Sequence, residues 1–248
     1  MIAALPLPLA TAAPVAGAGV DDLLSRPIVL VVALAVVSLV PFAFMTATAF
    51  VKIATVLQIV KSAIGAQGIP SSTIIMALSA ALTVVAMAPV GDRIAARAAP
   101  LLSAHADTVT LVRDGIDAVR EPLRDFLKAN ASEAERTRFF DVARRAREPR
   151  PGSGPSAPSA IGAAAVGPDD LTVVLPAFIV TELGQAFAIG FLIYLPFLVI
   201  DLVISNLLLA LGMQMMSPTQ VSLPFKLLLF VAIDGWGLLA RALVEGYR

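Results

Sequence analysis

Long stretches without a charged side chain limit what this chain can fold into more than any other feature. Residues 27–51 and 62–91 contain no Asp, Glu, Lys or Arg, and residues 183–225 contain only Asp201. A bilayer with a hydrocarbon core about 30 Å thick is crossed by about 20 helical residues, so each of these stretches is long enough. We therefore expect an all-α membrane protein with several helices.

Turn residues divide the N-terminal stretches into a predicted helical hairpin over residues 27–91. Pro41 is expected to kink the first helix, because proline removes a backbone hydrogen bond inside a helix. A turn rich in Gly and Pro precedes the second helix, which is predicted over residues 73–90. Ser71 or Ser72 is expected to cap that helix.

A second predicted hairpin covers residues 171–248. Its apolar run is too long for one membrane span, and Asp201 interrupts it. The last helix is expected over about residues 223–243. Four residues with turn-forming chemistry indicate where the chain reverses: Gly212, Ser217, Pro218 and Pro224.

Most charges lie between the two hairpins. Residues 92–170 hold 12 of the 18 basic and 12 of the 18 acidic residues, which predicts a small extramembrane domain. Pro122 predicts a kink or restart within an amphipathic helix there. The apolar residues that define this helix recur at spacings of four, three, four and three: Val112, Ile116, Val119, Leu123 and Phe126.

A second short helix is expected in this domain over residues 131–147, with Ser132 as its cap. Residues 149–168 are interpreted as a linker, because Pro, Gly and Ser dominate the start of this segment. The short helix is expected to turn three apolar side chains inward: Phe139, Phe140 and Val142.

Two lysines indicate the orientation in the membrane. Lys52 and Lys61 lie in the predicted connection between the first two helices, which carries no acid and is therefore expected on the cytoplasmic side. The 92–170 domain would then be periplasmic. Residues 1–26 are rich in Ala and Pro and lack the basic start of a signal peptide, so we expect an uncleaved N-terminal segment.

Composition excludes several classes of function. With 58% hydrophobic and 15% charged residues and a mean hydropathy of +0.88, the chain is far more apolar than soluble domains. A net charge of zero argues against nucleic-acid binding. The chain has no Cys and a single His, His105, which leaves no thiolate or two-imidazole metal site. With no nucleotide-binding loop or nucleophile triad either, we expect no enzyme, no cofactor and no metal.

Charges inside the apolar segments are candidate site residues, because a charge in a membrane needs a partner or water. Asp201, Lys226 and Asp234 are interpreted as buried charges, and we expect at least one of them to pair across a subunit interface. Lys226 and Asp234 are about two helical turns apart, too far to pair within one helix. Glu182 is interpreted as either an interface residue or a solvated helix end.

Three of the seven methionines lie at the predicted turn of the second hairpin: Met213, Met215 and Met216, with Gln214 among them. Thioether side chains are flexible and polarizable, so they can fill irregular or changing contacts without offering a charge. This property suits a seal. It equally suits ordinary packing at a helix end, and the residues alone leave both interpretations open.

Several motifs occur together and in one order. They are residues 49–53 and 56–65, Glu121-Pro122-Leu123-Arg124-Asp125-Phe126, and, in the second hairpin, residues 197–204, 211–216, 223–230 and Asp234-Gly235-Trp236. Over about residues 28–248 the chain thereby resembles the SctR/FliP family, the core export-gate subunits of bacterial type III secretion systems. Gln214 departs from the family, which has methionine there in many members. The missing signal peptide favours an injectisome member over a flagellar one.

The resemblance implies a pore-building subunit of the bacterial inner membrane. Such subunits form a pentameric, helical, ring-shaped assembly with S- and T-type subunits (Q- and R-type in flagella), and unfolded secreted proteins pass through its centre. Further implied partners are the U-type switch protein, the V-type export-gate protein and the inner rod and needle subunits. The resemblance also implies that a gasket limiting leakage is formed by Met213, Gln214, Met215 and Met216.

Two other classes fit parts of the sequence. A multi-spanning transporter or channel would also show proline-interrupted spans and intramembrane charges. Such a protein usually has an internal repeat, and we find none. A membrane scaffold that binds a partner through residues 92–170 is the other alternative, but it would leave the methionines and Asp201 without a role.

Overall fold

A computed structural model describes residues 27–66, 68, 70–103, 108–147, 167–213 and 215–247. All regular secondary structure in these ranges is helical, which confirms the predicted all-α class. The expectations for residues 1–26, for His105, for Gln214 and for most of the linker fall outside them. The helices are α2 (Pro27–Thr46), α3 (Phe50–Ile64), α4 (Ser72–Ser103), α5 (Thr108–Asn130), α6 (Glu133–Arg147), α7 (Leu171–Ala210), α8 (Pro218–Ala232) and α9 (Gly235–Glu245).

The chain divides into two compact units with a boundary after Phe42. In the first unit the structure describes α2 up to this residue, an uncharged stretch of helix with exposed apolar side chains such as Val31, Leu34 and Val37. Pro41 lies inside α2, and the helix continues through it to Thr46. Such a surface needs an apolar environment.

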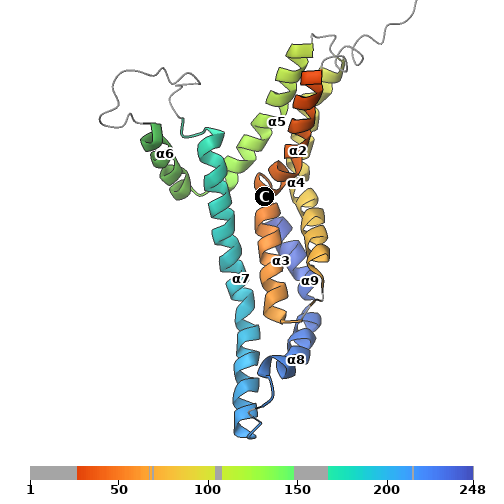
Figure 1. Cartoon of the computed structure of the whole chain (residues 1–248), viewed down its shortest axis with the longest axis vertical. Coiled ribbons are helices and arrows are strands. Elements are labelled where there is room, and N and C mark those ends of the chain that lie inside the picture. Colours follow the sequence, from red (N-terminus) through yellow and green to blue (C-terminus); the bar gives the residue numbers. More distant parts are fainter. Residues whose placement is uncertain are drawn as a thin grey trace, which may run out of the picture. The chain divides into compact units, whose positions relative to one another are not determined.

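The second unit is built around a helix pair, α3 and α7, which lie side by side (Figure 1). α4 and α8 also pack on α3, while α5 packs on α4 and α7, α6 packs on α7, and α9 packs on α4 and α8. The core between them consists of aliphatic side chains and Phe, with Ile53, Val56, Leu57 and Phe178 almost fully buried. α8 packs on α7 as well, so α3 and α7 together form the centre of this unit.

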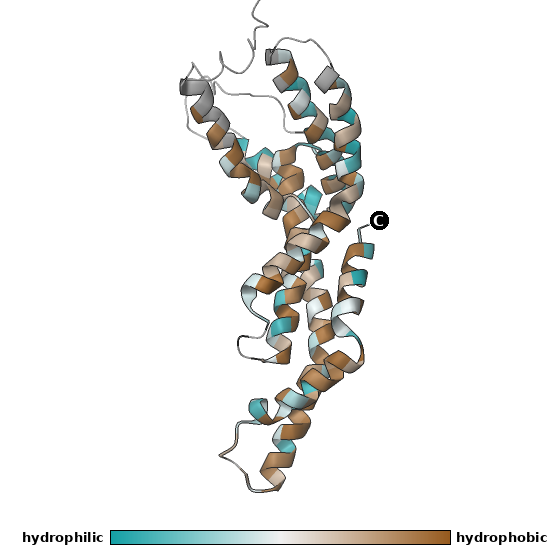
Figure 2. Ribbon diagram, turned by 90° about the vertical axis from the view of Figure 1, so that its right-hand side faces the viewer, coloured by the Kyte–Doolittle hydropathy of each residue, from teal (hydrophilic) through white to brown (hydrophobic). Residues whose placement is uncertain are grey.

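Two helices are long and apolar enough to cross a membrane, α4 over Ser72–Leu101 and α7 over Leu171–Ala210. Two bent helix pairs, α2 with α3 and α8 with α9, would raise the number of spans to four. Figure 2 shows hydrophobic residues over most of the ribbon, with hydrophilic ones gathered in the upper part of the view. The described residues thus form a multi-helix membrane protein.

The first predicted helix ends elsewhere than expected. The charge-free stretch 27–51 is not one helix, because α2 ends at Thr46 and α3 begins at Phe50. Thr48 stabilises the break between them, because its hydroxyl donates to the Phe44 carbonyl at 2.6 Å and accepts the Phe50 N–H at 3.3 Å. The supposed connection between the first two helices is therefore helix α3 itself, and the orientation argument from Lys52 and Lys61 loses its basis.

Helix α7 is a single element of 40 residues. It continues through Pro176, Pro196 and Asp201 and ends only at Ala210, two residues before Gly212. At 1.5 Å per residue a helix of this length extends about 60 Å, roughly twice a bilayer core. Part of α7 must therefore lie outside the hydrocarbon.

The other helices agree with the sequence predictions only in part. Ser71 caps α4 by accepting the Ile74 N–H at 3.3 Å, as expected, and α4 continues well beyond the predicted residue 90. α5 continues through Pro122, so the expected kink or restart does not end the helix there. The predicted last helix is two helices, because the chain breaks between α8 and α9 with a bend of 57°.

The amphipathic stripe of α5 is buried only in its second half. Phe126 is buried and Leu123 is half-buried, whereas Ile116 and Val119 are exposed. The Ser132 backbone N–H donates to the Thr181 hydroxyl at 3.0 Å, joining the start of α6 to α7. On α6, Phe139 and Phe140 are half-buried, and the prediction that Val142 turns inward is wrong because it is 59% exposed.

Candidate functional site: two ion-pair clamps and a methionine turn

An ion pair joins α3 to α7 near the first turn of α3. Lys52 Nζ lies 3.0 Å from Glu182 Oε1, with the two side chains 8% and 0% exposed. The Tyr247 hydroxyl donates to the other oxygen of Glu182, and its ring centroid lies 4.2 Å from Lys52 Nζ. The Ala49 carbonyl oxygen is 3.4 Å from the same hydroxyl. The C-terminal tyrosine thus encloses this pair beside the break that precedes α3.

A second ion pair lies at the opposite end of α3. Lys226 Nζ, on α8, lies 2.7 Å from Asp201 Oδ2 on α7 and donates to the Ala63 carbonyl at 3.2 Å. The Ser222 hydroxyl donates to Asp201 Oδ1. α3 ends here, at Gly65 with a left-handed φ of 75°. A cation at this position satisfies an end carbonyl of α3 and interacts favourably with the negative end of the helix dipole.

Together the two pairs clamp α3 along its length. Their carboxylates are both on α7 and 19 residues apart. Removing ions from water costs several kcal/mol each, so such groups persist only where partners satisfy them. Here the chain supplies these partners itself, which explains how strongly apolar helices carry Lys52, Glu182, Asp201 and Lys226.

The structure places the four predicted charges in different surroundings. It brings Asp201 and Lys226 together within one chain. Glu182 is fully buried inside α7, so its interpretation as a solvated helix end is wrong, because Lys52 and Tyr247 enclose the carboxylate. Asp234 is exposed at the break between α8 and α9, and none of the ion pairs found among the described residues includes it.

The Asp-Gly-Trp motif forms that break. Asp234 adopts a left-handed backbone with φ 50°, and its carboxylate would be 2.4 Å from a Cβ added to Gly237. A Cβ on Gly235 would meet the Phe230 ring at 2.3 Å. Trp236 packs edge-on against the same ring, with centroids 5.1 Å apart. Gly235 is therefore required by its close approach to the Phe230 ring, and the motif forms the bend between the helices.

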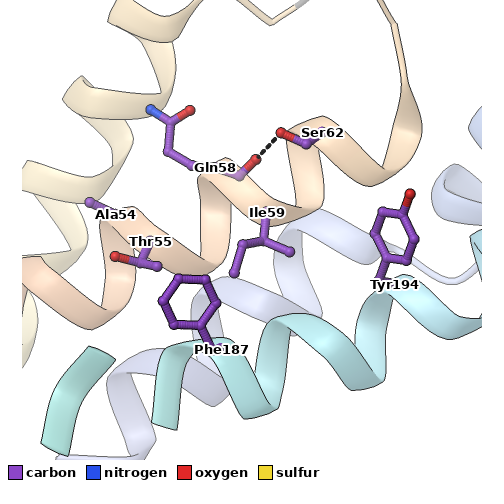
Figure 3. Close-up of a pocket in the computed structure, with 7 residues that line it drawn as sticks. All are labelled: Ala54, Thr55, Gln58, Ile59, Ser62, Phe187 and Tyr194. Atoms are coloured by element: carbon purple, nitrogen blue, oxygen red, sulfur yellow. Dashed lines mark hydrogen bonds between the residues drawn. The ribbon is translucent and has the colours of Figure 1, made fainter. Parts of the chain in front are cut away.

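A groove of about 400 Å³ follows the seam between α3 and α7 (Figure 3). Ile59 of α3 lies in it, with Phe187 and Tyr194 of α7 nearby. Beneath Ile59 is Gly190, where an added Cβ would lie 2.5 Å from the Ile59 Cδ1 atom. The absent side chain of Gly190 thus allows the two clamped helices to approach closely.

The turn between α7 and α8 has a defined hydrogen-bonded structure. Gly212 has a φ of 72° and donates its N–H to Leu209, while the Met213 N–H donates to Leu208 at 2.9 Å. This pair of bonds is a Schellman motif, which ends α7. The Met216 N–H then donates to the Met213 carbonyl at 3.3 Å. The turn predicted from Gly212 is confirmed.

The turn leaves its methionine side chains uncovered. Met215 is 101% exposed, and Met213 and Met216 are 42% and 45% exposed. Among the described residues Met213 and Met216 are partly covered and Met215 is not, so packing at the helix end, the alternative that the sequence left open, accounts at most for Met213 and Met216. Ser217 and Pro218 follow and begin α8.

Sequence reasoning missed three residues of the clamps: Lys52, Ser222 and Tyr247. Lys52 was assigned to a connection, since its partner lies 130 positions later in the chain. A usable signal exists: residues 27–91 and 171–232 together carry only three lysines, Lys52, Lys61 and Lys226, and two acids, Glu182 and Asp201, and unpaired charges are costly in a membrane. Tyr247 gave no signal, because its role depends on the C-terminus returning to α3.

These features define a class: a helical membrane protein whose helices are joined by buried ion pairs and whose longest hairpin ends in exposed methionines. Within this class the chain belongs to the FliP family, whose sequence profile matches residues 33–243. The family membership inferred from the motifs is thereby confirmed.

Known relatives agree with this assignment. The chain is 40% identical to the hypersensitivity response secretion protein HrcR of Ralstonia nicotianae, over 88% of this chain and 96% of the relative. It is 41% identical to the Yop proteins translocation protein R of Yersinia pestis, over 88% and 95% of the two chains. It is 36% identical to the flagellar biosynthetic protein FliP of Caulobacter vibrioides, over 94% of this chain and 79% of the relative.

Proposed function

We propose that this chain is a core subunit of a bacterial type III secretion export apparatus and contributes to its protein-conducting pore in the inner membrane. Family membership and relatives named for secretion and translocation support the assignment to a secretion apparatus. The structural observation that best supports the pore role is the methionine turn. It is anchored at both ends, it is uncharged, and its tip residue Met215 is fully exposed.

The proposed role of the turn is a gasket. Copies of the turn surround the pore axis, and Met213, Met215 and Met216 from neighbouring copies close on one another when no substrate is present. Thioethers can repack around a passing polypeptide because they are flexible and offer no fixed polar contact. Gln214 belongs to the same proposed gasket. No chemical step is part of this function.

The proposed assembly is a pentameric ring with S- and T-type subunits, in contact with the U-type and V-type export proteins and with the rod and needle subunits. The exposed apolar face of α7 supports an interface with further chains or lipid, since Phe187, Phe191 and Leu192 are all more than 60% exposed. Asp234, exposed beside the α8–α9 bend, is the remaining candidate for an ion pair between subunits. The proposal places the charged helices α5 and α6 outside the hydrocarbon of the membrane.

Cysteine cross-linking tests the position of the turn, because the chain has no native cysteine. Met213→Cys, Met215→Cys and Met216→Cys are compared with Val142→Cys, an exposed control on α6. We expect oxidised multimers from the turn variants only when the S- and T-type partners are present. Strictly monomeric product at all three positions, in an assembled apparatus, would reject the gasket.

A further inference from the structure

The α7–α8 turn leaves one thioether side chain more exposed than that of any other described methionine. Its base is fixed by the Schellman bonds from Gly212 and Met213, and it is closed by the bond from Met216 to Met213. Met215 lies at its tip with a fully exposed side chain. This geometry exposes the sulfur atom on all sides.

The other described methionines have different surroundings. Met45 and Met76 are 43% and 37% exposed, but they lie on apolar helices among the candidate membrane spans. Met87 is partly buried against the core. Surface exposed on such spans faces hydrocarbon or neighbouring helices, from which polar oxidants are excluded. The turn, in contrast, is followed at once by Ser217 and Pro218 at the start of α8.

We propose that Met215 is an oxidation site of this protein, with hydrogen peroxide or another small peroxide as the oxidant. The thioether sulfur attacks one peroxide oxygen, an S–O bond forms and the O–O bond breaks. Sulfur is oxidised by two electrons to the sulfoxide, the proton of the transferred oxygen passes to the leaving oxygen, and that oxygen departs as water from hydrogen peroxide or as an alcohol from an alkyl hydroperoxide. Met213 and Met216 react by the same chemistry, more slowly, because each is less than half exposed.

Oxidation removes the apolar character of the methionine side chains, on which the proposed seal depends. Methionine sulfoxide is polar and accepts strong hydrogen bonds, whereas the thioether is flexible and apolar. A ring of sulfoxides would be wetted and would no longer exclude water. This consequence rests on the proposed gasket, while the site of oxidation rests only on the geometry of one chain.

The site is tested by treating membranes that contain the full chain with hydrogen peroxide and following each methionine by peptide mass spectrometry. We expect Met215 to be oxidised first, at least several-fold faster than Met76 and Met87. Oxidation of Met76 or Met87 at an equal or higher rate than Met215 would overturn the assignment.

The consequence is tested by ion leakage through the complete apparatus. Met215→Gln introduces a polar side chain that peroxide does not convert, and Met215→Leu keeps an apolar side chain that cannot be oxidised. We expect peroxide to increase the leak of the wild type and of neither variant, and Met215→Gln to leak without peroxide.

The outcomes separate the two proposals. If Met215→Gln does not leak, the gasket is rejected and the oxidation has no effect on a seal. If Met215→Gln leaks but peroxide leaves the wild-type leak unchanged although Met215 is oxidised, the gasket stands and the oxidative effect is rejected. A peroxide response that persists in Met215→Leu would assign it to another residue.

Discussion

At the scale of single residues, the role of each buried charge in this protein is understood from the residues that bind it. Lys52 and Glu182 are almost completely removed from water and bind one another, with Tyr247 completing the cluster. A buried pair of this kind adds little over apolar replacements, but loss of one partner leaves an uncompensated charge. The cluster therefore sets a strong constraint on which single substitutions the fold tolerates.

The first prediction follows from this difference between replacing both partners of the pair and removing only one. Lys52→Met should destabilise the chain by about 3–5 kcal/mol, because Glu182 remains buried and charged. The double variant Lys52→Met with Glu182→Leu should recover part of this loss. Thermal unfolding of the purified chain in detergent measures both. The matched control is Arg138→Ala, at an exposed ion pair with Glu135, which should cost less than about 1 kcal/mol. Equal losses in the two single variants would contradict the prediction.

The second prediction concerns Asp169, outside the membrane spans. The hydrogen bond from Lys128 at 2.8 Å, with the charges of Lys128 and Arg136, holds the pKa of Asp169 below its ordinary value. Its contribution to stability is therefore present above the unfolded pKa of about 3.9 and is lost as the pH falls through the lower, folded pKa. Because the carboxylate is half exposed, the contribution is at most about 1 kcal/mol.

Asp169→Asn should accordingly lower the unfolding temperature slightly and equally from pH 5 to pH 8. The difference from the wild type should shrink as the solution is acidified below about pH 4. Unfolding temperatures measured across this range check the sign. A difference that grows on acidification would show that the pKa of Asp169 is raised instead.

At the scale of elements, α3 depends on its close approach to α7. Gly190→Ala should destabilise the pair by about 1–3 kcal/mol, since the new Cβ would overlap Ile59. Gly184→Ala is the matched control on the same helix, because nothing lies within 4 Å of its added Cβ. That variant should be neutral or stabilising by up to about 1 kcal/mol, since alanine favours helix. Combining Gly190→Ala with Ile59→Ala should relieve the overlap, and its failure to do so would contradict the account.

The elements also show how far the sequence predicts the fold. Charge-free stretches correctly predicted an all-helical chain, and Gly212 correctly predicted the turn after α7, because both signals are local. Proline is a less reliable signal: Pro224, interpreted as a turn residue, lies inside α8, and Pro41 and Pro122 lie inside helices that continue through them. Packing can offset the single hydrogen bond that each proline removes.

The sites were less predictable than the helices, for a physical reason. Asp201 and Lys226 were recognised as charges that need partners, and the structure pairs them with one another. Lys52 was assigned to a connection because hydropathy does not distinguish the break before α3 from a continuous helix. Its pairing with Glu182, and the contribution of Tyr247, depend on contacts between distant segments that no local pattern encodes.

At the scale of the whole molecule, the second unit combines a clamped helix pair with an uncovered turn at the end of its longest helix. The clamps satisfy four buried charges, Lys52, Glu182, Asp201 and Lys226, within one chain, so assembly does not have to supply partners for these four. The turn and the apolar face of α7 remain exposed and available for contacts with further chains. This division of roles is what the proposed pore subunit requires.

The central claim, that secreted protein passes the methionine turn, is tested most directly by photo-cross-linking. A photoreactive amino acid at position 215 is compared with one at position 84, an exposed residue on α4, while a substrate is stalled in transit through the apparatus. The account predicts a cross-linked adduct with the stalled substrate from position 215 and none from position 84. Adducts from position 84 but not from position 215 would contradict it.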